Sequence, residues 1–415
     1  MEFLKIHVHK FLLISTLIGV FSESFLLRVG FDLKLIYIIA FVNSVILILK
    51  YRYTLKSKFN VYLFFIFILG VATVFIYDNQ INRVFFQIVG IFFLGNYFNN
   101  FFKTTPYSSE YIFDKYCEYV FYLCVIGLII FFTFYFTGID FLKSIALILP
   151  FGYPNMTSTL KVQSLMLEPA HFAGLVLPAF LYSLYNYRKR KIVFFTITLA
   201  LFLSFSSVGY IGAVLALLIS NISKLIYKIT IITIAFLFAI LAYTYIPDVK
   251  LRVDDTYTFV SKGDNDFSGL NLSTYAIGSN FYIASQVVKD SPFVGHGIGS
   301  HPISHMKYIR KVNSGVILDE LGMTKINSED ANSLFIRVIS EFGILGIFFV
   351  ILFIVKNYSK RNFNISQSIL LYFFYKLFRE GHYFSPEMYF FIFLYIRLKY
   401  LKNNKTYKTK LQRAQ

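Results

Sequence analysis

The chain has 415 residues, of which 57% are hydrophobic and 15% are charged, with 51 Phe, 32 Tyr and no Trp. A soluble domain carries about 25% charged residues, so this composition excludes a water-soluble globular protein. The net charge of +18 would indicate a nucleic-acid partner in a soluble protein. In a membrane protein, the same excess arises from Lys and Arg collected in cytoplasmic loops.

Apolar segments recur along the whole chain. A bilayer core is crossed by roughly 20 helical residues, and the sequence predicts about twelve such spans by this measure. They lie near 8–28, 34–50, 59–77, 83–98, 116–138, 163–185, 191–204, 206–221, 228–246, 331–355, 366–380 and 387–399. The seventh and eighth are either a hairpin or one bent element. The first has no small-residue cleavage site, so it is predicted to be an uncleaved span. We therefore expect an all-α polytopic membrane protein.

The basic clusters give the orientation. With the N-terminus inside, the clusters at 50–58, 188–191, 224–228 and 356–361 and the tail after 395 all fall on the cytoplasmic side. Both termini are then cytoplasmic. The positive charge becomes an orientation signal, so the bilayer is the expected partner and nucleic acid is not.

One long polar segment interrupts the spans. Residues 247–330 lie between spans nine and ten and are too long for a simple connection, so they are predicted to form a large, partly helical external loop. Within it, 274–289 predict a helix and 291–299 a turn-rich loop. The chain is thus divided into 1–246, 247–330 and 331–415, with a second external loop at 138–161.

Ionisable residues near span ends are the candidates for chemistry. Pro169 suits the first turn of a helix running to about Tyr185, which places Glu168 beside its N-terminus. His171 follows on roughly the same face. The two side chains could act as a general base pair or bind hydroxyl groups. Alternatively, Glu168 is a helix cap and His171 a packing residue.

A second cluster lies in 291–305, which contains His296, His301 and His305. His301 and His305 have the i,i+4 spacing of helical metal ligands, but Pro302 intervenes and no Cys accompanies them, so no metal is expected. The Gly-x-Gly-x-Gly run has no βαβ unit around it, which argues against a dinucleotide site. A tight turn is expected there, with a base or acceptor-binding role for one histidine.

Two further clusters follow. Arg337 and Glu341 share one helical face inside a span, so they are predicted to pair, in either a structural or a functional role. Arg379, His382 and Tyr383 lie near the outer end of span eleven. An outward Arg beside a His suits an anionic group such as a phosphate or diphosphate. A snorkelling interfacial Arg is the alternative. Cys117 and Cys124 are read as apolar packing residues.

The order of these motifs resembles a known family. It comprises Glu168-Pro-x-His-Phe-Ala, the hairpin at 204–209, the large loop with Pro-Phe-x-Gly-x-Gly-x-Gly, and Asn332 followed by Glu341-Phe-Gly-x-Leu-Gly. With Arg379-x-Gly-x-Tyr, residues 150–395 are similar to the O-antigen polymerase (Wzy) and O-antigen ligase (WaaL) superfamily. The resemblance implies a metal-independent, GT-C-like glycosyltransferase of the bacterial plasma membrane. It also implies no cofactor and a substrate of polyprenyl-diphosphate-linked oligosaccharide outside the membrane, with a flippase and a chain-length regulator as partners.

The sequence also departs from that family. Ala331 stands where the ligase-type pattern has His, which favours a polymerase of O-antigen or capsule repeats over a ligase acting on lipid A core. The usual loop Arg is missing, so the diphosphate-binding charges are expected from Lys161, Arg252, Arg310, Lys311 and Arg379. The expected catalytic residues are Glu168, His171, His301, His305 and His382, supported by Arg337, Glu341 and Tyr383. A lipid-linked oligosaccharide flippase is the alternative from another functional class.

Overall fold

The computed structural model describes residues 2–22, 25–28, 32–51, 53–139, 151–152, 161–166, 168–220, 247–262 and 266–400, with isolated positions between 229 and 245. The described chain is predominantly helical. Its elements are, in order, α1 (Glu2–Val20), β1 (Leu26–Arg28), β2 (Asp32–Lys34), α2 (Leu35–Lys50), α3 (Lys58–Tyr77), α4 (Ile81–Thr104), α5 (Ser109–Thr137), β3 (Phe151–Gly152), α7 (Pro169–Tyr185), α8 (Lys191–Leu203), α9 (Ser207–Ile219), α11 (Pro247–Lys262), α12 (Leu272–Asp290), α13 (His301–Tyr308), η1 (Ile309–Lys311), α14 (Val316–Glu320), η2 (Met323–Lys325), α15 (Leu334–Asn357), α16 (Phe363–Phe378) and α17 (Pro386–Tyr400).

The membrane character of the helices is evident from length and composition. Within the described ranges, α3, α4, α5 and α15 are long and apolar enough to cross a membrane, and four shorter apolar helices lie in α1, α2, α8 and α9. This confirms an all-α fold with candidate membrane-spanning helices. The stretches at 191–204 and 206–221 form two separate helices, because the chain turns at 204–206, where Ser206 caps α9.

Several predicted spans differ from the structure at their boundaries. α4 continues past the predicted end at 98 to Thr104, and α5 begins at Ser109, before the predicted start at 116. The span at 8–28 is too long, because α1 ends at Val20 and the chain then enters β1, the middle strand of a small antiparallel sheet with β2 and β3. The span at 163–185 begins too early. Residues 161–166 are not helical, and α7 starts at Pro169, which disfavours helical backbone at the residue before it. The span at 228–246 falls largely outside the described residues.

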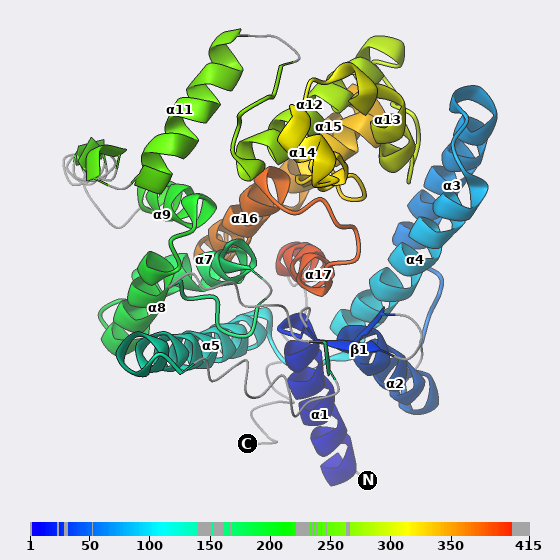
Figure 1. The fold of residues 1–415 in the computed structure, drawn as a ribbon. Coiled ribbons are helices and arrows are strands. Elements are labelled where there is room, and N and C mark those ends of the chain that lie inside the picture. The colour runs from blue at the N-terminus through cyan, green and yellow to red at the C-terminus, as the bar shows by residue number, and fades with distance from the viewer. Residues whose placement is uncertain are drawn as a thin grey trace.

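The main cluster of buried apolar side chains among the described residues involves α7, α16 and α17, which lie near the middle of Figure 1. α7 packs against α16, α9, α8 and α5, while α17 packs against α4 and α16. Large aromatic side chains fill the space between them, including the fully buried Tyr116, Phe172, Tyr372 and Phe391. Packing contacts, rather than helix propensity, therefore hold the short helices α7, α16 and α17 in place.

The segment 247–330 has structure of its own. Helix α12 covers the predicted helix at 274–289, and its cap residue Asn271 accepts hydrogen bonds from Ser273 N and Thr274 N. A small core of Phe267, Leu270, Tyr275 and Val312 lies within the segment. α12, α13 and α14 gather beside α15 (Figure 1), and α12 and α13 both contact α15.

Helix α15 is broken at Gly343, where φ is +62° and ψ is −158°. Residues 291–297, within the predicted turn-rich loop, supply the backbone hydrogen-bond partners that the break requires. Ile344 N donates to Pro292 O at 3.0 Å, and His296 N donates to Ser340 O at 3.1 Å; Leu345 N to Phe293 O and Gly297 N to Glu341 O complete the pairing. The glycine-rich motif thus forms the expected tight turn, and its backbone approaches a helix.

Candidate functional site

Arg379 lies at the centre of an ion-paired cluster drawn from three distant segments. α16 ends at Phe378, and Arg379 has extended backbone there. Its Nη1 donates to Asn332 Oδ1 at 2.6 Å, and its Nη2 donates to Glu168 Oε2 at 3.1 Å. Glu168 precedes α7 but makes no capping hydrogen bond. Its carboxylate is therefore directed to Arg379, contrary to the capping alternative.

This cluster is partly open. The side chain of Arg379 is 22% exposed and that of Glu168 is 51% exposed. A guanidinium with its fork of donors can bind a phosphate group in two parallel hydrogen bonds. A carboxylate 3.1 Å away can accept a proton from a hydroxyl that approaches the same place. The arrangement therefore offers an anion-binding group and a base side by side.

Two loops with left-handed backbone support Arg379. Asn332 and Glu380 have φ of +60° and +70°, which is unusual for residues other than glycine. Glu380 N donates to Asn332 O at 2.9 Å. A Cβ at Gly381 would lie 1.7 Å from Asp330 O, so only glycine fits. The close contact between the loops fixes the point from which the Arg379 side chain extends.

A buried ion pair, Arg337–Glu341, contacts the turn at 379–383 that follows α16. Arg337 Nε donates to Glu341 Oε1 at 3.1 Å, as the i,i+4 spacing predicts, and Arg337 Nη1 donates to Gly381 O at 3.0 Å. Tyr383 donates to Glu341 Oε2 at 3.0 Å and its ring lies 4.2 Å from the guanidinium. Arg337 and Glu341 are 2% and 0% exposed. These residues therefore hold the 381–383 turn from within the protein.

A second buried ionic cluster, which the sequence patterns did not predict, joins the same turn at 379–383 to α16 and α17. Lys376 Nζ lies 2.6 Å from Glu380 Oε1 and 3.5 Å from Glu387 Oε1. Ser385 donates to Glu380 Oε1 at 2.7 Å. All three charged side chains are almost fully buried. The i,i+4 spacing of Lys376 and Glu380 was a usable signal, whereas the approach of Glu387 depends on how α17 packs.

Two of the predicted histidines lie close to this turn. His382 is 44% exposed, and its Nε2 lies 3.4 Å from Asp330 Oδ2. His171, in the first turn of α7, is partly buried and interacts electrostatically with Glu380. Both are therefore neighbours of the Arg379 turn, through Asp330 and Glu380 respectively.

His301 and His305 occupy a different environment, inside the protein. His301 Nε2 is 2.9 Å from Asn280 Oδ1, and its Nδ1 is 3.1 Å from Ser340 Oγ. Burial, with added repulsion from His305 and Arg337, holds the pKa of His301 well below its usual value. Burial also lowers the pKa of His305 to about 4. Both rings are enclosed in the protein and contact neither Arg379 nor Glu168 among the described interactions, so their predicted catalytic role stays a prediction.

The remaining predicted cations lie apart from this cluster. Arg252 on α11 and Arg310 and Lys311 in η1 are exposed, and Lys161 is half-buried in the stretch before α7. Lys311 lies over the Tyr308 ring at 5.6 Å. In the described part of the chain, Arg379 is therefore the one predicted diphosphate ligand with a contact to Glu168.

The described residues contain no group of three or more His, Cys, Asp or Glu side chains arranged to hold a metal ion.

Comparison with known proteins adds no family: no protein-family model matches the chain, and no curated protein is significantly similar to it.

Proposed function

We propose that this protein is a membrane glycosyltransferase that polymerises lipid-linked oligosaccharide repeats, as the motif order suggests. The observation that supports it best is the contact of Arg379 with Glu168 and Asn332. Three motifs that are far apart in sequence meet there, in a place open enough to receive a ligand. An anion-binding Arg beside a carboxylate is what transfer from a sugar diphosphate requires.

In this mechanism, Arg379 binds the diphosphate of the donor. The acceptor hydroxyl oxygen forms a bond to the anomeric carbon of the donor sugar. The bond from that carbon to the diphosphate oxygen breaks, and the diphosphate leaves with the electron pair. Glu168 accepts the hydroxyl proton, with His171 and His382 as the other candidate bases. The charge on the leaving group is stabilised by the Arg379 guanidinium.

The resting contact between Arg379 and Glu168 fits this sequence of events. Because the Glu168 side chain is 51% exposed, solvent screens this ion pair and it contributes only about 0–1 kcal/mol. Donor phosphate oxygens can therefore replace the carboxylate at little cost. Glu168 is then released to act on the acceptor, while Asn332 Oδ1 still accepts a hydrogen bond from Arg379 Nη1. Donor binding would in this way expose the base.

The number of spans and their orientation in the membrane follow from the same proposed function. We expect about twelve spans in a GT-C-like arrangement in a bacterial plasma membrane, with both termini cytoplasmic and 247–330 outside. The chemistry would then take place at the outer face, on a polyprenyl-diphosphate-linked oligosaccharide delivered by a flippase. A chain-length regulator would act on the same product.

Polymerisation of lipid-linked repeats by purified protein tests the proposal. We expect Arg379→Ala to reduce the rate about 100-fold or more, in line with the loss of one preorganised donor. Arg379→Lys should recover part of it, because a lysine keeps the charge but not the paired donors. Arg83→Ala, which removes a guanidinium that is paired with Glu329 outside the cluster, is the control. A native rate for Arg379→Ala would show that the diphosphate assignment is wrong.

The surface glycan of a deletion strain separates the related functions. Single-repeat stubs indicate a polymerase, unattached long polymer indicates a ligase, and absent glycan indicates a flippase. Ala331, in place of the histidine of the ligase-type pattern, is the observation that favours the first outcome.

A further inference from the structure

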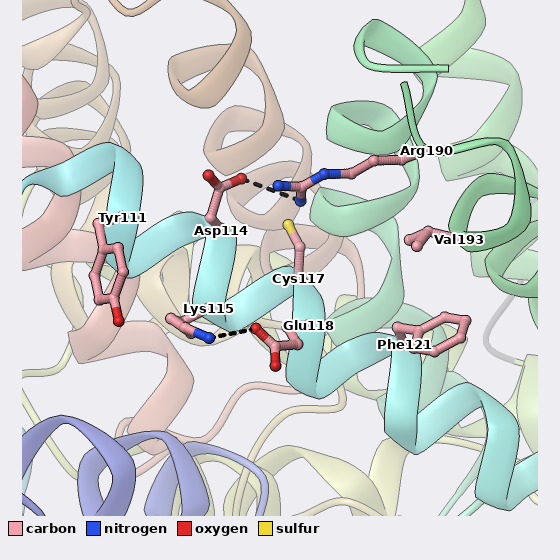
Figure 2. Close-up of a pocket in the computed structure, with 8 residues that line it drawn as sticks. All are labelled: Tyr111, Asp114, Lys115, Cys117, Glu118, Phe121, Arg190 and Val193. Carbon is pink, nitrogen blue, oxygen red and sulfur yellow. Dashed lines mark hydrogen bonds and ion pairs between the residues drawn. The ribbon is translucent and has the colours of Figure 1, made fainter. Parts of the chain in front are cut away.

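A cavity with charged residues in its lining lies away from Arg379, between the first turns of α5 and the start of α8. Its volume is about 400 Å³, and it is lined by Tyr111, Asp114, Lys115, Cys117, Glu118, Phe121, Arg190 and Val193. Figure 2 shows Arg190 reaching across to Asp114, and Lys115 and Glu118 side by side on α5. Ligand-binding pockets typically enclose roughly 300–1,000 Å³, so the cavity has room for a small polar group.

The cavity lies at the level where a membrane begins. In α5, the charged residues all fall in the first ten positions, and 119–137 carry none. In α8, the basic run 188–191 precedes twelve uncharged residues. The two helices contact each other, and their charged ends meet at the cavity. The charged lining therefore marks the boundary between water and lipid, where headgroups lie.

The charges around the cavity are balanced. Arg190 Nη1 is 3.2 Å from Asp114 Oδ1, and Lys115 Nζ is 2.6 Å from Glu118 Oε2. All four side chains are between 35% and 42% exposed. Ion pairs exposed to this degree contribute about 0–1 kcal/mol, so a ligand that carries both charges can replace both pairs at little cost. A purely anionic ligand would instead meet two carboxylates.

Apolar ridges lead away from the cavity on both helices. On α5, Tyr122, Ile126 and Ile129 are exposed at helical spacing, beginning beside Glu118. On α8, Ile192, Phe195 and Leu199 are exposed at the same kind of spacing. A ligand with a zwitterionic head in the cavity can therefore lay acyl chains along an apolar surface.

We infer that this cavity binds the headgroup of phosphatidylethanolamine. Its phosphate would contact Arg190 and Lys115, and its primary ammonium would donate hydrogen bonds to Asp114 and Glu118. A choline headgroup has the same charges but no N–H donor, and a glycerol headgroup has no cation. The site would therefore distinguish lipids by the number of N–H donors and by the positive charge of their headgroups. This inference is independent of the glycosyltransferase proposal.

Native mass spectrometry of the purified full chain tests it with a headgroup series. Dioleoyl phosphatidylethanolamine, its N-methyl and N,N-dimethyl forms, and dioleoyl phosphatidylcholine are compared at equal concentration, with dioleoyl phosphatidylglycerol as the anionic probe. We expect retention to fall at each methylation and to be about tenfold weaker or more for choline, the cost of losing charge-assisted hydrogen bonds. Equal retention of all lipids, or tighter retention of phosphatidylglycerol, would overturn the inference.

Matched variants locate the site. Glu118→Gln, which removes an acceptor for the primary ammonium, should reduce the preference for ethanolamine over choline about tenfold. Arg190→Gln, which removes a contact to the phosphate that both lipids share, should weaken the retention of both. Arg188→Gln and Glu110→Gln, exposed neighbours that do not line the cavity, should leave that preference unchanged. If the two control variants reduce it as much, the lipid binds elsewhere. The wild-type headgroup series decides the question even if a cavity variant fails to fold.

Discussion

Arg379 and Glu168 lie 211 residues apart in the sequence, yet Nη2 of the first is 3.1 Å from Oε2 of the second. This ion pair joins the start of α7 to the end of α16, the two helices whose side chains fill the centre of the protein. It places a carboxylate and a guanidinium where neither is fully buried. The cluster can therefore exchange an internal partner for a ligand without a large rearrangement.

Removing the charge of Glu168 distinguishes its proposed role as a base from its role as the ion-pair partner of Arg379. In the proposed reaction, Glu168→Gln should lower kcat about 100-fold or more, the usual contribution of a general base. KM for the lipid-linked donor should stay equal or fall, because Arg379 no longer has an internal carboxylate to release. Steady-state polymerisation rates at several donor concentrations measure both. Glu329→Gln, in an exposed pair with Arg83, is the control, and an unchanged kcat in Glu168→Gln would assign the base to a histidine.

The buried pair Arg337–Glu341 should be costly to break from one side. Glu341→Gln leaves a guanidinium that is 2% exposed without its carboxylate, and such a loss costs about 3–5 kcal/mol. Arg337→Leu with Glu341→Leu should recover much of that stability, because no uncompensated charge remains. Thermal unfolding in detergent compares the three proteins. Arg83→Gln should change stability by at most about 1 kcal/mol; an equal loss there would contradict the burial argument.

Acid should destabilise the protein through α13. His305 has a pKa of about 4 in the folded chain and about 6.5 when unfolded. Between these values the unfolded chain binds more protons, so stability falls as pH is lowered from 6.5 toward 4. His301, which faces His305 and Arg337, adds to the effect in the same direction. His305→Gln should flatten the dependence of melting temperature on pH in this window, and an unchanged slope would contradict the role of His305.

The break in α15 can be tested with two glycines of similar φ. Gly322→Ala introduces a side chain at φ +65° into open space, at a cost of about 1–2 kcal/mol. Gly343→Ala has a similar φ but would place Cβ 2.5 Å from the Phe293 backbone. We expect an additional loss of about 1–3 kcal/mol from the forced displacement. Melting temperatures of the two variants give the comparison, and equal losses would show that the loop yields easily.

Local patterns predicted much of the fold. Leu35–Lys50 and Lys58–Tyr77 lie within one residue of the predicted spans, because long apolar runs between charged residues define them. Pro169 marked the start of α7 through its own backbone restriction. The pairing of Arg337 with Glu341 followed from helical spacing alone. Each of these features is set by residues close together in the chain.

The parts that could not be predicted depend on distant contacts. Nothing near β1 indicates that it will pair with Phe151–Gly152. Nothing near Glu168 indicates that Arg379 will replace its cap contact. His301 and His305 have a spacing that suits metal ligands, but the packing of α13 against α15 turns them inward. Sequence periodicity predicts which face of a helix is apolar. The residues that pack against that face depend on how the neighbouring helices are arranged.

The pairing of loop 291–297 with α15 also imposes an order on biosynthesis. The ribosome makes the loop first, yet the acceptors for His296 N and Gly297 N are carbonyls of Ser340 and Glu341. Until that later segment has been made and inserted, the loop cannot complete its hydrogen bonds. A nascent chain halted before 341 would therefore present an unfinished segment to proteases and chaperones, and final folding would wait for the tenth predicted span.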